Sequence, residues 1–333
     1  MKFKFLVIGS NSFSGSHFIA HLISKNQNVL GVSRSSEINK VFLPYKWNKI
    51  KKEQGKFKFY KININKQSSK LLNLIKKFNI SHIINFAAQG MVEQSWNSPH
   101  DWYQTNLLSQ VNLFQGLIKL KKIKKYIHIT TPEVYGSTKN WLKENFNFNP
   151  STPYAISRAA CDMHLSALFK VKKFPVIFTR ASNVYGPGQQ LYRIVPKTLI
   201  SSISGKKISL NGGGKSRRSF IFIDDVCSAI YKILLYGKIG ETYHISTNEI
   251  YSIKNLVKQI SNLTSVSYKN LAKNSNERKG KDHAYLLDTS KIRKNLKWSD
   301  QINLNTGLVE TLKWIKNNYS YLKKNSTEYK HKA

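Results

Sequence analysis

Residues 7–18, VIGSNSFSGSHF, have the residue types of a phosphate-binding loop. Gly9, Ser12 and Gly15 stand three residues apart, directly after an apolar run and at the start of a helical one. In such a turn the first glycine permits a tight backbone, the middle position faces a pyrophosphate, and the last lets helix and sheet pack closely. The N–H groups and dipole of the helix N-terminus then favour an anion. The stretch predicts a dinucleotide site, in which Ser12 departs from the usual middle glycine.

The end of the next apolar run, GVSRSS at 31–36, bears on which dinucleotide fits. A site for NAD usually has an acid here to hold the ribose 2′-hydroxyl. This chain has Ser33, Arg34, Ser35 and Ser36 instead, a cluster able to bind a 2′-phosphate. The cluster favours NADP, and NAD stays open.

A lone carboxylate follows a later apolar run. Residues 129–136 read ITTPEVYG, which places Glu133 after a strand-like segment, two threonines and a proline. The chain has only 17 acidic residues against 54 lysines and arginines, so an acid at a strand end is unusual for it. Such a carboxylate can act as a general base. It can also cap or salt-bridge the loop that follows, and both interpretations stay open at this point.

These candidate residues need a scaffold, and strand-like and helix-like segments alternate through the first half of the chain. This alternation predicts an α/β fold, a Rossmann-type doubly wound parallel sheet with helices on both faces. The predicted strands are 4–9, 28–33, 81–88, 124–130 and 174–182, and the predicted helices are 15–25, 68–78, 101–121 and 153–170.

The pattern loosens from about residue 186, which predicts a smaller C-terminal α/β substrate-binding lobe. We expect an NAD(P)-binding domain over 1–180, with later returns near 220–247. The lobe should take up most of 181–320, and 321–333 should be a frayed basic tail.

Composition narrows the class of protein. Hydrophobic residues at 41% and aromatic residues at 12% suit a globular chain, and no apolar run approaches the ~20 residues of a membrane span. Cys161 and Cys227 lack metal-ligand spacing, so we expect neither a disulfide nor a metal site. We therefore expect a cytoplasmic protein.

The net charge of +37 raises the question of nucleic acid. The lysines are scattered without a basic stripe interleaved with aromatic residues, which favours a compositional bias of the solvated surface. We expect no nucleic-acid partner, although a non-catalytic NAD(P)-binding protein recruited by its charge stays an alternative.

Several motifs together carry a family resemblance. In chain order they are GSNSFSG, INFAAQ, TTPEVYG, STPYAISRAACD, TRASNVYGPGQQ, RSFIFIDDV and RKGKDHAYLLDTSKIRKNLKW. In this order they resemble the extended short-chain dehydrogenase/reductases (the epimerase/dehydratase family), and most closely the nucleotide-sugar 4,6-dehydratases such as dTDP-glucose and GDP-mannose 4,6-dehydratase. The resemblance covers roughly residues 3–318. It implies a homodimeric lyase for polysaccharide sugars, with tightly bound NAD or NADP that is regenerated in each cycle.

The resemblance also implies catalytic roles. Tyr154 matches the tyrosine that takes the proton of the sugar 4-hydroxyl while C4 loses hydride. Arg158 stands where the family has a lysine, one helical turn further on; it keeps a positive charge beside the phenol and can bond the nicotinamide ribose, but it cannot relay a proton. Thr131 matches the residue that bonds the 4-oxygen. Glu133 matches the base that removes the C5 proton once C4 is a ketone, so that water can be eliminated and hydride returned to C6.

Pro132 departs from part of the family. In dTDP-glucose dehydratases this position is an aspartic acid that protonates the departing hydroxyl, whereas GDP-mannose dehydratases lack it, so Glu133 can serve as both base and acid. Simple 4-epimerases usually have no carboxylate here, but UDP-glucuronate decarboxylases have a comparable one. An NDP-sugar epimerase and a UDP-glucuronate decarboxylase therefore stay alternatives.

Further residues are assigned by the same resemblance. Asn183, Arg193, Arg218 and Arg278, with Thr131, match positions that bind the nucleotide sugar. The residues that match cofactor-binding positions are Gly9, Asn11, Ser12, Phe13, Gly15, Ser33, Arg34, Asn63, Ile64, Ala87, Ala88, Tyr154 and Arg158.

Overall fold

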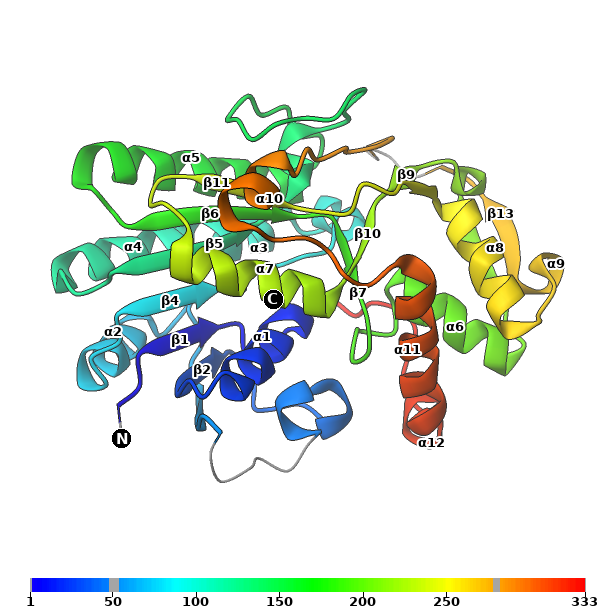
Figure 1. Cartoon of the computed structure of the whole chain (residues 1–333), viewed down its shortest axis with the longest axis horizontal. Coiled ribbons are helices and arrows are strands. Elements are labelled where there is room, and N and C mark those ends of the chain that lie inside the picture. The colour runs from blue at the N-terminus through cyan, green and yellow to red at the C-terminus, as the bar shows by residue number, and fades with distance from the viewer. Residues whose placement is uncertain (1, 48–53, 278–281, 333) are drawn as a thin grey trace.

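The computed structural model describes residues 2–47, 54–277 and 282–332. Its larger part is a seven-stranded parallel sheet in the order β11-β6-β5-β4-β1-β2-β3 (Figure 1). The strands are β1 (Phe5–Ile8), β2 (Val29–Ser33), β3 (Phe57–Lys61), β4 (His82–Asn85), β5 (Lys125–Thr130), β6 (Val176–Ala181) and β11 (Thr242–Ile245). The main flanking helices are α1 (Phe13–Ser24), α2 (Ser68–Lys77), α4 (Ser109–Leu120), α5 (Pro153–Lys172) and α7 (Ile223–Tyr236).

The apolar strands form because both faces of the sheet are covered. Successive side chains point to opposite faces, so in β1 the residues Phe5 and Val7 pack with α1 and α7. Leu6 and Ile8 pack into the other layer with α2, α4 and α5. The strand order reverses between β1 and β4, and the carboxyl ends of strands at such a point are where ligands bind in open α/β sheets. The Rossmann-type prediction is confirmed.

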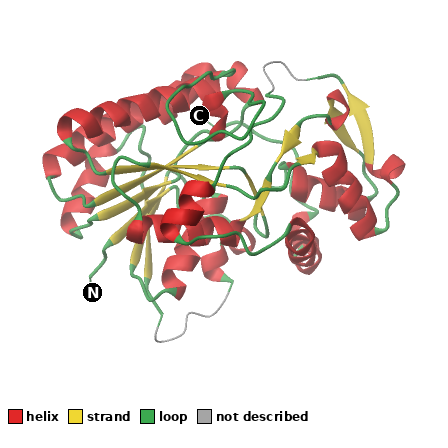
Figure 2. Ribbon diagram, turned by 45° about the horizontal axis from the view of Figure 1, so that its top comes forward, coloured by secondary structure: helices red, strands yellow, loops and turns green. Residues whose placement is uncertain are grey.

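A smaller part lies at one end of the sheet (Figures 1 and 2). It contains short two-stranded sheets that pair β7 with β10, β9 with β12 and β8 with β13. Their bounds are β7 (Asn183–Tyr185), β8 (Ile208–Asn211), β9 (Arg217–Arg218), β10 (Phe220–Phe222), β12 (Tyr251–Ser252) and β13 (Ala272–Ser275). The helices here are α6 (Ile194–Ser204), α8 (Ile253–Thr264), α9 (Tyr268–Leu271), α11 (Leu304–Asn317) and α12 (Tyr319–Leu322).

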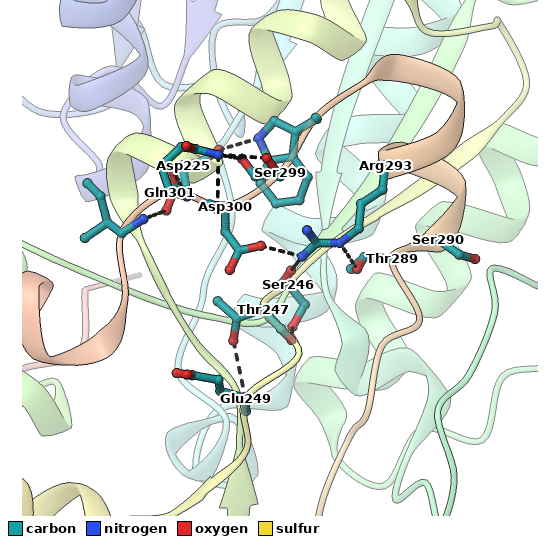
Figure 3. A network of polar contacts seen from close by, with 12 residues as sticks. Asp225, Ser246, Thr247, Glu249, Thr289, Ser290, Arg293, Ser299, Asp300 and Gln301 are labelled. Carbon is teal, nitrogen blue, oxygen red and sulfur yellow. Dashed lines mark hydrogen bonds and ion pairs between the residues drawn. The ribbon is translucent and has the colours of Figure 1, made fainter.

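A polar network joins the first turn of α7 to the segment before α11 (Figure 3). The carboxylate of Asp225 accepts from the backbone N–H groups of Gln301 and Ile302, both at 3.0 Å. Arg293, on α10 (Ser290–Leu296), pairs with Asp300 and donates to the Thr289 hydroxyl at 2.9 Å. These bonds hold the chain where it passes from the sheet to the lobe.

The predicted helix 101–121 is interrupted. It consists of α3 (Pro99–Tyr103), a π-helical turn over Gln104–Leu108, and then α4. The extra residue of a π turn changes which side chains face inward, and such turns are frequent at functional sites. Here Asn106 is buried, and its amide bonds the backbone N–H of Gln89 at 2.8 Å and the Ser157 hydroxyl at 3.0 Å. The turn therefore fastens the loop after β4 to α5.

Both cysteines are free and buried. Within 2–47, 54–277 and 282–332, no helix has the length and apolar character needed to cross a membrane.

Candidate active site

The loop between β1 and α1 is built as its glycines predict. Gly9 has φ +87°, and a Cβ there would lie 2.8 Å from the Ala87 backbone nitrogen. A Cβ on Gly15 would lie 2.3 Å from the Gly9 carbonyl oxygen, so no larger residue fits at either position. Ser12 caps α1: its hydroxyl accepts from the Gly15 N–H at 3.1 Å and donates to the Gly9 carbonyl at 2.6 Å. The serine in the middle of the motif thus stabilises the turn itself.

The same loop fits a dinucleotide. The first turn of α1 has no acidic residue, which leaves the positive end of its dipole available to an anion. Asn11 donates from its amide to the Ser36 carbonyl at 2.8 Å, and its backbone N–H donates to the Ser33 hydroxyl at 3.0 Å. The Asn11 Oδ1 atom is buried and has no hydrogen-bond partner among the described groups. Buried acceptors are rarely left unpaired, and a ribose hydroxyl can supply the missing donor.

The turn that carries Glu133 begins where β5 ends. Thr131 is its N-cap, in extended conformation, and its hydroxyl accepts from the Glu133 N–H at 3.3 Å. Pro132 is the first residue of the 3₁₀ turn Pro132–Tyr135. A proline suits that position because its missing N–H would have no helical partner. The fold thus accommodates Pro132 while the position loses its acid.

Tyr154 lies in the first turn of α5. Thr152 caps this helix by accepting from the Ala155 N–H at 3.2 Å, and Pro153 occupies the first helical position. The cap fixes where the helix starts, and so it fixes which side chain emerges beside the end of β5.

The phenol of Tyr154 makes a hydrogen bond with Thr131, and the charge of the Glu133 carboxylate acts on it. Burial raises the pKa of Tyr154, and the Glu133 carboxylate raises it further. The Arg158 charge and a hydrogen bond with Thr131 act in the opposite direction. The Arg193 charge also lowers this pKa. Groups that lower the pKa of the phenol stabilise its phenolate form, so the arrangement is suited to proton abstraction.

Arg158 is almost completely buried. It is only 2% exposed, and its guanidinium donates to the Ile129 carbonyl and lies 3.4 Å from His128 Nε2. Asp162, one turn further along α5, accepts from Arg180 at 2.9 Å and from Thr130 at 3.1 Å. The Arg158 charge is therefore held in a buried polar cluster behind Tyr154, and the bond to the nicotinamide ribose stays a prediction.

Glu133 has a partner that the sequence analysis did not assign. The hydroxyl of Tyr285 donates to Glu133 Oε1 at 3.2 Å and lies 3.4 Å from Asn183 Oδ1. The Arg218 guanidinium stacks on the Tyr285 ring, 4.3 Å from its centroid. Burial raises the pKa of Glu133, and the Arg218 charge opposes part of that increase. In the sequence analysis the late motif KDHAYLLD served only as evidence of the family resemblance. Its tyrosine, Tyr285, was the residue that could have indicated a partner for Glu133.

The other predicted residues lie around this centre. Asn183 begins β7, beside Tyr285. Arg193 precedes α6 and donates to the Gly90 carbonyl at 3.4 Å, and its positive charge lowers the pKa of Tyr154. Arg218 is 8% exposed and donates to the Asp282 carbonyl at 2.8 Å. Arg278 lies outside the described residues, so its role stays a prediction.

The remaining cofactor positions follow the strands. Ala87 and Ala88 come after β4, and Ala88 is exposed. Asn63 and Ile64 come after β3. The side-chain Oδ1 atom of Asn63 accepts from the Asn65 N–H at 2.9 Å, which forms a local turn. Arg34 is exposed just after β2, and Phe13 is buried in α1. All of them lie at the carboxyl edge of the sheet, where the switch point predicts a ligand.

The C-terminal segment, for which we expected fraying, makes defined contacts beside the site. The Gln89 amide donates to the Lys332 carbonyl at 2.7 Å. The His331 ring stacks on Trp102 with centroids 4.9 Å apart and lies 2.7 Å from an Asp101 carboxylate oxygen. The segment therefore borders the loop after β4.

The sheet, the glycine loop and the Thr131–Tyr154–Arg158 set define an extended short-chain dehydrogenase/reductase. Comparison with known families agrees, because the model of the GDP-mannose 4,6 dehydratase family matches residues 6–311. The dTDP-D-glucose 4,6-dehydratase of Dictyostelium discoideum is 30% identical, over 96% of this chain and 82% of that protein. The chain therefore belongs to the GDP-mannose 4,6 dehydratase family and is a nucleotide-sugar 4,6-dehydratase.

Solved structures agree with this assignment. The dTDP-glucose 4,6-dehydratase DesIV of Streptomyces venezuelae, with NAD bound, gives a TM-score of 0.87 at 26% identity, over 96% of this chain and 98% of that one. The dTDP-glucose 4,6-dehydratase of Bacillus anthracis, in complex with NAD, gives 0.85 at 28% identity, over 97% and 99%.

Proposed function

We propose that this chain converts dTDP-glucose, or a closely related nucleotide-diphosphate hexose, into its 4-keto-6-deoxy form. The observation that carries the proposal is that Glu133 and Tyr154 both bond Thr131: its hydroxyl accepts from the Glu133 N–H, and it makes a hydrogen bond with the Tyr154 phenol. A phenol suited to take a hydroxyl proton and a carboxylate suited to take a carbon-bound proton are both required for oxidation followed by elimination.

The glycine loop, Asn11, Ser33 and the alanines after β4 would hold the cofactor. When bound, the nicotinamide would supply a reversible acceptor and donor of hydride. Tyr154 takes the proton of the 4-hydroxyl, Thr131 bonds the 4-oxygen, and the Arg158 charge stabilises the phenolate.

Glu133 then carries out the elimination. Once C4 is a carbonyl the C5 proton is acidic, and Glu133 removes it. The C6–O bond breaks as the C5–C6 double bond forms, and the departing hydroxyl leaves as water with the proton that Glu133 returns. A hydride returned at C6 and a proton delivered to C5 complete the product, and the C5 proton balances the one that Tyr154 took from the 4-hydroxyl. Because Pro132 carries no proton, Glu133 serves as both base and acid.

We infer NAD as the cofactor, although Ser33–Ser36 favoured NADP on sequence grounds. Two observations support NAD: the Ser33 hydroxyl already accepts from the Asn11 N–H, and the unpaired Asn11 acceptor suits a ribose hydroxyl better than a phosphate. Two related dTDP-glucose dehydratases, moreover, were solved with NAD.

We further propose a cytoplasmic homodimer. Ile156 and Met163 on α5, and Leu108 just before α4, are 42%, 60% and 49% exposed, which leaves apolar side chains on one side of the α4–α5 layer. A second copy covering this face would remove them from water. Light scattering at micromolar concentration should give the mass of a dimer, and a monomer mass contradicts this part of the proposal.

The activity is tested with purified protein and a panel of dTDP-glucose, GDP-mannose, UDP-glucuronate and UDP- or GDP-linked N-acetylhexosamines. We expect loss of one water from a substrate, a 4-keto product and no net reduced cofactor. An unchanged mass with inverted C4 would indicate an epimerase, and loss of carbon dioxide would indicate a decarboxylase. Tyr154→Phe is the negative control.

A further inference from the structure

We propose that Tyr285 is a positioning residue that lets the single carboxylate of Glu133 act first as a base and then as an acid. This inference rests on the proposed dehydration. Its starting point is Pro132, which leaves no acidic group next to Glu133 in the chain, so one carboxyl must change protonation state twice within a turnover. A group that holds it must tolerate both states.

The geometry around Tyr285 meets this requirement. Its hydroxyl lies 3.2 Å from Glu133 Oε1 and 3.4 Å from Asn183 Oδ1, and both atoms are acceptors. Tyr285 is only 6% exposed, and Arg218 stacks on its ring, so the phenol has little freedom to leave. Arg218 is in turn anchored by the carbonyls of Asp282 and His283, at 2.8 and 3.0 Å.

A phenol hydroxyl can donate one hydrogen bond and can also accept one, so Tyr285 can bond Glu133 in two ways. While Glu133 is a carboxylate, Tyr285 donates to Oε1 and keeps the carboxylate oriented. Once Glu133 carries the C5 proton, the Tyr285 hydroxyl can turn its proton to Asn183 Oδ1 and stay beside Glu133 as an acceptor. The Glu133 carboxyl is thus held in both its ionised and its protonated form, while Tyr285 neither gains nor loses a proton.

Charge around Glu133 sets the direction of the expected pH effect. The groups that face it are Tyr285, Arg218, Asp282 and Tyr154. The hydrogen bond from Tyr285 favours the carboxylate, as does the Arg218 charge, whereas the Asp282 charge and burial oppose it. Removing the Tyr285 hydroxyl should therefore raise the pKa of Glu133. The acid limb, which is the low-pH part of the plot of dehydration rate against pH, should then move to higher pH.

The test is Tyr285→Phe in the full-length protein, with wild type and Tyr185→Phe in parallel. Tyr185 is also buried, and its hydroxyl donates to the Leu304 carbonyl at 3.2 Å, so it controls for the loss of a buried tyrosine hydroxyl. In Tyr285→Phe we expect dehydration to slow by about 10- to 100-fold, the effect of losing a hydrogen bond to a charged group. Its acid limb should rise by about one pH unit or more. C4 oxidation, followed in a single turnover, should stay within about threefold of wild type.

A second variant keeps the test independent of stability. Replacement of Tyr285 by 3-fluorotyrosine retains the ring and strengthens the donor, so the acid limb should move to lower pH. The inference is overturned if Tyr285→Phe keeps the wild-type limb and dehydration rate, or if 3-fluorotyrosine moves the limb upward. A wild-type protein that gives no 4-keto product from any substrate overturns the proposed function instead, so the two failures are distinct.

Discussion

Replacement of Glu133 by glutamine should separate the two halves of the reaction. Glutamine has nearly the shape of glutamate and can still accept from Tyr285, so the change removes the proton transfer and leaves the local packing in place. General acid–base catalysis by one group is worth about 10²- to 10⁴-fold. Because Pro132 offers no second acid, loss of Glu133 affects both proton transfers, and we expect dehydration to fall at least ~10³-fold.

C4 oxidation should respond in the opposite way. The Glu133 carboxylate raises the pKa of Tyr154, so its neutralisation lowers the pKa of the phenol. Oxidation of C4 in Glu133→Gln should therefore begin at lower pH than in wild type. Stopped-flow absorbance of the reduced nicotinamide measures this step, and mass spectrometry of quenched samples measures loss of water.

A matched control is Glu144→Gln. Glu144 is another carboxylate whose pKa is raised by burial, and it accepts from the His244 backbone N–H at 2.9 Å. We expect this variant to dehydrate normally. Formation of the 4-keto-6-deoxy product by Glu133→Gln at a rate within tenfold of wild type would refute the role assigned to Glu133.

Two more predictions concern charge. Arg158→Lys should keep kcat within about tenfold of wild type because a cation stays beside Tyr154. Arg158→Met should raise the pKa of Tyr154, so the low-pH limb in a plot of the C4 oxidation rate against pH should move to higher pH. Identical pH–rate plots for the two variants would contradict this prediction. Burial lowers the pKa of His17 to about 4 and that of His244 to about 3. Above about pH 6.5, the pKa of histidine in the unfolded chain, both histidines are neutral in either state and the folded protein keeps its full stability. As the pH falls from about 6.5 toward the lower pKa values of the folded state, the unfolded chain takes up protons first. The free energy of unfolding should therefore drop over this range, by about 3 kcal/mol for His17 alone. Urea unfolding at a series of pH values measures the drop, and His17→Gln should flatten it.

Much of the scaffold was predictable because strands buried on both faces contain runs of buried apolar residues. The segments assigned to β1, β2, β4, β5 and β6 all satisfy this condition. β3 does not, and it was missed. It is an edge strand, FKFYK, in which exposed lysines interrupt the partly buried aromatic residues, so its sequence lacks an apolar run.

Parts of the site were beyond sequence reasoning for a related reason. The contact between Tyr285 and Glu133 joins residues 152 positions apart, and no periodicity reports such a pair. The π turn at Gln104–Leu108 arises from the tertiary bonds of Asn106, whereas the local pattern reads as one helix. The depth of Arg158 is likewise set by the buried cluster around Asp162.

The loop at Gly9–Gly15 was the opposite case. There the close approach of two backbone segments dictates glycine, so residue type alone identified the turn. The serine between them was noted only as a departure from the usual middle glycine, and its capping bond to the Gly15 N–H became evident only in three dimensions.

The most direct test of the account follows the hydrogen on C4. A nucleotide hexose deuterated at C4 should give a 4-keto-6-deoxy product with the deuterium in its C6 methyl group and with no deuterium left on the cofactor. That result requires oxidation, elimination and hydride return in one site. Deuterium retained at C4, or lost to solvent, would contradict the account.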